Sequence, residues 1–179
     1  MQNYNITVAG FGGQGVLFTG TLLANIGMIM GKEASWLPSY GPEMRSGSCN
    51  CGIVISDAKI GSPVVFNPNL LVVFSPPALA KFEPRMEKGG LMFYESTLIP
   101  TKPTRSDVTL IDIPAARLAN EAGLDGYANA LIVGHVMKKT GICDMAIGKQ
   151  AIEKAISERR VADIDKNIKA MEIGFGYAS

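Results

Sequence analysis

The sequence is poor in the groups that most active sites and charged interfaces need. Only 18% of its 179 residues are charged, the net charge is +1, and there are three cysteines and one histidine. A nearly neutral chain lacks the basic field through which proteins hold nucleic acids or anionic membranes. Its cysteines and single histidine do not form a four-ligand zinc or iron–sulfur pattern, and no Ser-His-Asp or Cys-His set is evident. We therefore expect no nucleic-acid partner and no metal bound by this chain alone.

Long hydrophobic runs and targeting signals are also lacking. The most apolar stretch, residues 16–30, is interrupted by threonines, glycines and an asparagine, which makes it too polar and too short to span a bilayer. The polar start "MQNYN" does not resemble a signal peptide, so we expect a cytoplasmic protein without a membrane partner. Hydrophobic residues are plentiful at 47%, enough for the core of a single domain over residues 1–179.

Strand and helix patterns alternate along the chain. The β-branched run "NITVAG" leads through glycines into a helix over 16–30, and the continuous apolar run "NLLVVFS" is typical of a strand covered on both faces. The other expected strands are "ASWL", ended by Pro38, and "SCNCGIVIS", "GGLMFYES" and "DVTLIDIP"; further helices are expected near Pro76, from Pro114, from Tyr127, over 144–160 and from Asp163. The pattern predicts an α/β fold, a three-layer α/β/α domain with a mostly parallel sheet and a helical C-terminal third.

Two candidate chemical groups are better explained by packing. In "SCNCGIVIS" the residues Cys49 and Cys51 share one strand face with two isoleucines, which favours buried, inert thiols over a redox or metal pair. His135 lies four residues after Leu131 on the same helical stripe, which favours a core or interface histidine over a catalytic base.

The first helix opens on a glycine turn. Gly10, Gly12 and Gly15 have the G-x-G-x-x-G spacing of dinucleotide-binding turns, which present free N–H groups to a pyrophosphate. That fingerprint also requires an acidic residue at the end of the second strand, and none follows "ASWL". A dinucleotide is therefore disfavoured, and two interpretations stay open: a turn facing another phosphate-bearing ligand, and a turn that only packs a strand against its helix.

A second glycine-containing segment, Ser39 to Gly47, has no apolar period and is predicted to be a structured loop extending to Ser48. Arg45 in this segment could hold a carboxylate or phosphate through two parallel hydrogen bonds. An exposed crossover in which Glu43 and Arg45 pair with each other is the equally weighted alternative.

Three motifs together resemble the gamma subunit of the 2-oxoacid:ferredoxin oxidoreductases. They are "GFGGQGV", "SYGPEMRSGSCNCGIVIS" and "YANALIVGHVMKKTG", and the resemblance covers nearly the whole chain. Within that family the sequence is most similar to the 2-oxoglutarate (2-ketoglutarate) type, with the 2-oxoisovalerate, pyruvate and indolepyruvate types as near relatives. Ser46 stands where we expect glycine in relatives.

The resemblance implies a subunit of a larger enzyme that converts a 2-oxoacid, coenzyme A and oxidised ferredoxin into acyl-CoA, carbon dioxide and reduced ferredoxin. Alpha and beta subunits, with or without a small delta subunit, would hold thiamine diphosphate, Mg²⁺ and 4Fe-4S clusters. This chain would contribute no catalytic residue and would be inactive alone. The competing hypotheses are an autonomous nucleotide- or phosphate-binding module and an assembly protein. The positions that the resemblance places near the coenzyme A cleft are Gly10, Gly12, Gly13, Gln14, Gly15, Ser39, Tyr40, Gly41, Pro42, Glu43 and Arg45.

Overall fold

A computed structural model describes residues 3–40, 47–156 and 160–178 of the chain. Six strands form one sheet in the order β2-β3-β1-β4-β5-β6. β3 pairs antiparallel with both of its neighbours, and the remaining ladders are parallel, so β3 alone runs against the other strands. The predicted mostly parallel sheet is therefore confirmed. The strands are β1 (Tyr4–Phe11), β2 (Glu33–Tyr40), β3 (Ser48–Ser56), β4 (Leu70–Val73), β5 (Leu91–Glu95) and β6 (Thr109–Ile113).

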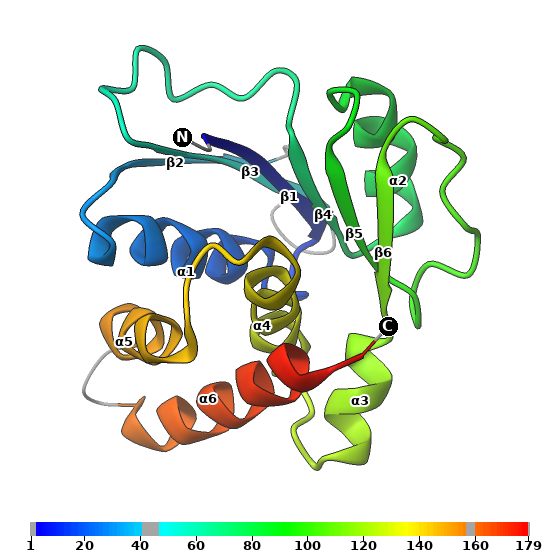
Figure 1. The fold of residues 1–179 in the computed structure, drawn as a ribbon. Coiled ribbons are helices and arrows are strands. Elements are labelled where there is room, and N and C mark those ends of the chain that lie inside the picture. Colours follow the sequence, from blue (N-terminus) through cyan, green and yellow to red (C-terminus); the bar gives the residue numbers. More distant parts are fainter. Residues whose placement is uncertain (1–2, 41–46, 157–159, 179) are drawn as a thin grey trace.

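Helices cover the two faces of the sheet unequally (Figure 1). α1 (Val16–Ile29) and α4 (Ala128–Thr140) cover one face, and α5 (Met145–Ala155) and α6 (Val161–Gly176) pack outside them. The opposite face carries α2 (Pro76–Phe82), which leads into the short 3-10 helix η1 (Glu83–Arg85) and encloses a smaller hydrophobic cluster. The three expected layers are confirmed.

The middle of the sheet follows the predicted pattern. All four residues of β4 are buried between two parallel neighbours, which explains a strand without polar alternation. α2 begins where expected, because the Ser75 hydroxyl accepts a hydrogen bond of 3.4 Å from the Ala78 N–H and Pro76 occupies the first helical position. α3 (Ala115–Glu121) begins directly after Pro114, which occupies the N-cap position, and it has no side-chain cap.

The second strand differs from the prediction. β2 does not stop at Pro38 but continues to Tyr40, and β3 begins at Ser48, so both ends of the predicted 39–48 loop belong to strands. β2 is an edge strand that pairs with β3 only, and an edge strand tolerates a residue without an N–H. Residues 41–46 lie outside the described residues.

The cysteine stripe is buried as predicted. Cys49 is 8% exposed, and Cys51, Ile53 and Ile55 are fully buried under α1. Burial raises the pKa of the Cys49 thiol and raises that of Cys51 to about 12, so neither is a reactive thiolate near neutral pH. The interpretation as inert core thiols is confirmed.

The C-terminal helices enclose His135. Its ring lies edge-on to Phe93 and Tyr177, Nδ1 is 3.2 Å from the Gly174 carbonyl oxygen, and burial lowers its pKa. The core interpretation is confirmed. The helix predicted over 144–160 ends earlier, at Ala155. Within the described ranges, no helix is long and apolar enough to cross a membrane.

Candidate functional site around the glycine turn

The glycine turn lies at a topological switch point of the sheet. β1 and β4 are parallel neighbours, yet the chain leaves β1 for α1 on one face and leaves β4 for α2 on the other (Figure 1). The two connections diverge at the carboxyl ends of the strands, where a cavity of about 220 Å³ has Gly10, Ser75 and Pro77 in its lining. Ligands of open α/β sheets bind in such crevices, so the fold places the turn where a binding role is physically favoured.

The conformation of the turn requires glycine at two positions. The Gln14 N–H donates to the Phe11 carbonyl oxygen at 3.2 Å, which closes the turn. Gly13 has φ +96° and Gly15 has φ +77°, a region that side chains strongly disfavour. Gly15 caps α1 without a side-chain hydrogen bond, so the first N–H groups of α1 have no side-chain cap. The turn therefore offers a partly positive helix end beside exposed backbone.

Two of the predicted site residues serve the fold. The Gln14 side chain accepts a hydrogen bond from the Phe11 N–H at 2.7 Å and donates to the Phe74 carbonyl oxygen at 3.1 Å, which ties the ends of β1 and β4 together. A Cβ on Gly10 would lie 2.5 Å from Gln14 Oε1 and 2.9 Å from Phe74 Cβ. Glycine at position 10 thus makes room for the Gln14 bridge.

The glycine turn and the Ser39–Gly47 segment meet at one end of the sheet. The Gly12 N–H donates to the Gly47 carbonyl oxygen at 3.1 Å, and Cys49 of β3 pairs with Gly10 on one side and Tyr40 on the other. Ser39 pairs with Asn50 and lines a cavity on the α2 side of the sheet. The other predicted positions of this segment, Gly41, Pro42, Glu43 and Arg45, lie outside the described residues.

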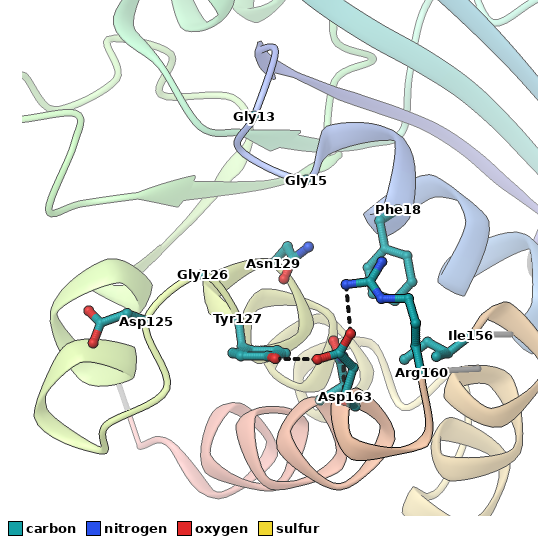
Figure 2. A pocket seen from close by; sticks show the side chains of 11 residues that line it. Gly13, Gly15, Phe18, Asp125, Gly126, Tyr127, Asn129, Ile156, Arg160 and Asp163 are labelled. Carbon is teal, nitrogen blue, oxygen red and sulfur yellow. Dashed lines mark hydrogen bonds and ion pairs between the residues drawn. The ribbon is translucent and has the colours of Figure 1, made fainter. Parts of the chain in front are cut away.

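A pocket of about 510 Å³ lies on the opposite side of the turn, between Gly13 and Gly15 above and the C-terminal helices below (Figure 2). Phe18 of α1 and Ile156 after α5 give it apolar walls, whereas α4 and α6 supply polar groups. Of the predicted residues that the structure describes, Gly13 and Gly15 line it. Its lining consists of Gly13, Gly15, Phe18, Asp125, Gly126, Tyr127, Asn129, Ile156, Arg160, Asp163 and Asn167.

A hydrogen-bonded network forms the end of the pocket away from the turn. The Tyr127 hydroxyl donates to Asp163 Oδ1 at 2.8 Å, and the Arg160 guanidinium lies 2.6 Å from Asp163 Oδ2 (Figure 2). The hydrogen bond from Tyr127 and the charge of Arg160 lower the pKa of Asp163, and the carboxylate raises the pKa of Tyr127. Asp163 is therefore ionised near neutral pH, with its charge balanced by Arg160.

Sequence reasoning missed the α4 and α6 lining. Tyr127 and Asn129 belong to the third motif, "YANALIVGHVMKKTG", but their residue types alone indicated no role. Asp163 is separated from Tyr127 by 36 positions, so only the tertiary fold brings the two side chains together.

The donor set does not fit a metal or cluster. Among the described residues, no three or more His, Cys, Asp or Glu side chains lie close enough together to hold a metal ion. Thiamine diphosphate needs a divalent cation to anchor its diphosphate, and a 4Fe-4S cluster needs thiolates. We therefore assign no step of either chemistry to this chain.

The chain is similar to known oxidoreductase subunits along its whole length. It is 38% identical over 179 residues to the ketoisovalerate oxidoreductase subunit VorA of Methanothermobacter marburgensis, covering 99% of this chain and 37% of VorA. It is 34% identical over 177 residues to the 2-oxoglutarate synthase subunit KorC of Methanocaldococcus jannaschii, covering 97% of this chain and 92% of KorC. The chain thus spans little more than a third of VorA but nearly all of KorC.

The fold is shared with a solved structure as well. The gamma subunit of a keto/oxoacid ferredoxin oxidoreductase from Geobacter sulfurreducens superimposes with a TM-score of 0.80 and 25% identity, covering 96% of each chain. Residues 5–177 match the family model described as pyruvate ferredoxin/flavodoxin oxidoreductase. The resemblance carried by the three motifs is thereby confirmed, and this chain belongs to the pyruvate ferredoxin/flavodoxin oxidoreductase family.

Proposed function

We propose that this chain is the gamma subunit of a thiamine-diphosphate-dependent 2-oxoacid:ferredoxin oxidoreductase. The match to KorC carries the proposal, because it extends over 92% of a separate subunit rather than over one segment of a longer chain. The complete enzyme would convert a 2-oxoacid, coenzyme A and oxidised ferredoxin into acyl-CoA, carbon dioxide and reduced ferredoxin. The gamma chain would be inactive alone.

We propose 2-oxoglutarate as the substrate, with succinyl-CoA as the product. The three motifs and the nearly full-length match to KorC support this choice. A 2-oxoisovalerate enzyme is the second candidate, because the identity to VorA is higher, at 38%. The two substrates differ in a second carboxylate, so an assay that compares them separates the candidates.

The proposed roles of the subunits follow from the residues that this chain contains. Alpha and beta subunits, with or without a delta subunit, would hold thiamine diphosphate, Mg²⁺ and the 4Fe-4S clusters and would pass electrons to ferredoxin in the cytoplasm. This chain would place its glycine turn and the Ser39–Gly47 segment beside the cleft that coenzyme A enters. The hydrogen bond between Gly12 and Gly47 supports a joint role for the two segments, since it brings them to one end of the sheet.

The test is purification of the tagged chain from its native cell, followed by mass spectrometry of the co-purifying chains and an assay of the complex. We expect chains of the same enzyme and coenzyme-A-dependent reduction of ferredoxin with 2-oxoglutarate. The assay is repeated with 2-oxoisovalerate, pyruvate and indolepyruvate, and with complex reconstituted without the gamma chain. Higher kcat/KM with 2-oxoisovalerate would move the assignment to that substrate. A chain that purifies alone and binds a nucleotide would favour an autonomous module.

A further inference from the structure

The pocket beneath the glycine turn is lined by a hydrogen-bond donor, the side-chain N–H₂ group of Asn129, that the described part of the chain leaves without a partner. Asn129 at the start of α4 is only 8% exposed, and its Oδ1 accepts a hydrogen bond from the Ala130 N–H at 2.9 Å. That bond fixes which end of the amide is oxygen. The Nδ2 group lies against Gly15, where a Cβ would overlap it, and has no hydrogen-bond partner within the described part of the chain. Figure 2 shows this nitrogen turned toward the Phe18 side of the pocket.

The Asn129 Nδ2 group is open to the pocket, where water or a ligand oxygen can accept its hydrogen bonds. Asn129 lies beside the start of α1, whose first N–H groups also lack a side-chain cap. Asn129 and Gly15 at the start of α1 line the same pocket as Gly13, which is exposed and has nothing within 4 Å of where a Cβ would stand. The missing Cβ lets a ligand approach the backbone closely.

The charges in the pocket are divided between its two ends. Asp163 lies at the end away from Gly13 and is balanced by Arg160 and Tyr127 (Figure 2). Asp125 accepts a hydrogen bond from Asn120 at 2.8 Å and points away from the pocket (Figure 2). The end near the turn is lined by Gly13, Gly15 and Asn129, beside the N-terminus of α1, which is the positive end of its helix dipole. This end is suited to an anion with several oxygens.

We propose that Asn129, together with the N-terminus of α1 and the Gly13–Gly15 backbone, forms a binding site for the phosphoryl group of a ligand. Asn129 belongs to the third motif, "YANALIVGHVMKKTG", and the sequence alone indicated no role for it. The site deepens the proposed function, on which it rests for the identity of the natural ligand. The binding of a phosphoryl group by the chain itself is measurable without the other subunits.

The test uses inorganic pyrophosphate as the probe and the full-length chain, with calorimetric titration at about 0.1 M ionic strength, where the Debye length is about 10 Å. Asn129→Asp exchanges the donor for a carboxylate but keeps the oxygen that Ala130 contacts. We expect the affinity for pyrophosphate to fall by about tenfold or more, because one donor is lost and a negative charge is added beside the anion. Asn50→Asp is the matched control, since it adds the same charge on the α2 side of the sheet, and should change the affinity by less than about threefold.

A second pair of variants keeps the test decisive if Asn129→Asp does not fold. Gly13→Asn and Gly13→Asp introduce side chains of the same shape that tolerate positive φ, and they differ in charge only. We expect Gly13→Asp to bind pyrophosphate at least about tenfold more weakly than Gly13→Asn. Melting temperatures, measured in parallel, show whether each variant is folded.

Three results of the pyrophosphate titrations would overturn the proposal. They are absence of binding to the wild-type chain, equal affinities within both pairs, and a loss confined to Asn50→Asp, which would place the anion on the α2 side. A titration with 2-oxoglutarate separates phosphoryl from carboxylate recognition. Binding of the dicarboxylate in place of pyrophosphate, with the same dependence on Asn129, would also overturn it. Since none of these measurements needs the partner subunits, the phosphoryl site and the gamma-subunit function can fail independently.

Discussion

Two groups of glycines in this chain have opposite purposes. The first, residues 10–15, forms a turn at the carboxyl edge of the sheet, and the second, Gly134 and Gly174, lies where α4 crosses α6. A Cβ on Gly134 would overlap the Met171 carbonyl oxygen, and one on Gly174 would overlap that of Leu131. A Cβ on Gly13 would meet nothing within 4 Å. The second group permits backbone-to-backbone packing, whereas the exposed part of the first leaves open space beside a pocket.

The comparison shows that glycine spacing does not determine glycine function. The G-x-G-x-x-G pattern draws attention to the first group, yet Gly10 serves packing and Gly13 does not. No glycine-spacing pattern marks the second group, although it lets α4 and α6 pack closely and leaves the Gly174 carbonyl oxygen 3.2 Å from His135 Nδ1. The surroundings of the missing side chain, rather than the pattern, separate a packing glycine from one that a ligand can approach.

The largest effect on stability is expected from Gly174→Ala. The added methyl group cannot fit against the Leu131 carbonyl oxygen, so α6 must move away from α4, and we expect a loss of about 3 kcal/mol in the free energy of unfolding. Gly176→Ala is the matched control on the same helix, because its Cβ would meet nothing within 4 Å, and it should leave stability unchanged or slightly raised. Urea unfolding followed by circular dichroism measures both. Equal stabilities would show that the helix crossing is looser than described.

The largest effect on activity is expected from Arg45→Ala in the assembled enzyme. If Arg45 contacts an anionic group of coenzyme A, the variant loses roughly 1.5–3 kcal/mol and the KM for coenzyme A rises by about 10- to 150-fold. Arg117→Ala removes an arginine from an exposed pair on α3 and serves as the control. Steady-state kinetics, varying coenzyme A and the 2-oxoacid separately, gives the answer. A change in the 2-oxoacid KM alone would place Arg45 at the substrate carboxylate, and no change would favour the exposed crossover.

Features that depend on neighbouring residues in the sequence could be predicted. The apolar run of β4, the alternating cysteine stripe of β3 and the Ser-Pro-Pro start of α2 each follow from local periodicity and capping. The position of β2 within the sheet could not be predicted. Its place at the edge lets the strand continue through Pro38, against the local signal.

The candidate site was predictable only in part, for the same reason. The glycine turn could be located from the sequence. The bridging role of Gln14 could not, because it depends on a hydrogen bond to Phe74, 60 positions away. The contact between Gly15 and Asn129 spans more than half of the chain. Such contacts arise when the layers pack together, and no window of sequence contains both partners.

A moderate effect is expected from Gly10→Ala. The new Cβ would displace the Gln14 side chain and strain its hydrogen bonds to Phe11 and Phe74, for a loss of about 2 kcal/mol in the free energy of unfolding. Gln14→Ala removes the same bridge without crowding. If the Gln14 bridge is the reason for glycine at position 10, the double variant Gly10→Ala/Gln14→Ala should lose about 1 kcal/mol less than the sum of the two single losses. Additive losses in urea unfolding would assign the glycine to the contact with Phe74 instead.

The smallest effect on stability is expected from Gly13→Ala. No atom obstructs the added methyl group, so the only cost is the positive φ of +96°, worth about 1 kcal/mol. Gly13→Asn should lose less, because asparagine adopts positive φ more readily than alanine. The two variants therefore separate backbone strain from lost space, and urea unfolding should rank them wild type, Asn, Ala. A loss from Gly13→Ala as large as that from Gly174→Ala would mean that position 13 is closely packed after all, and would remove the open space on which a ligand-facing turn depends.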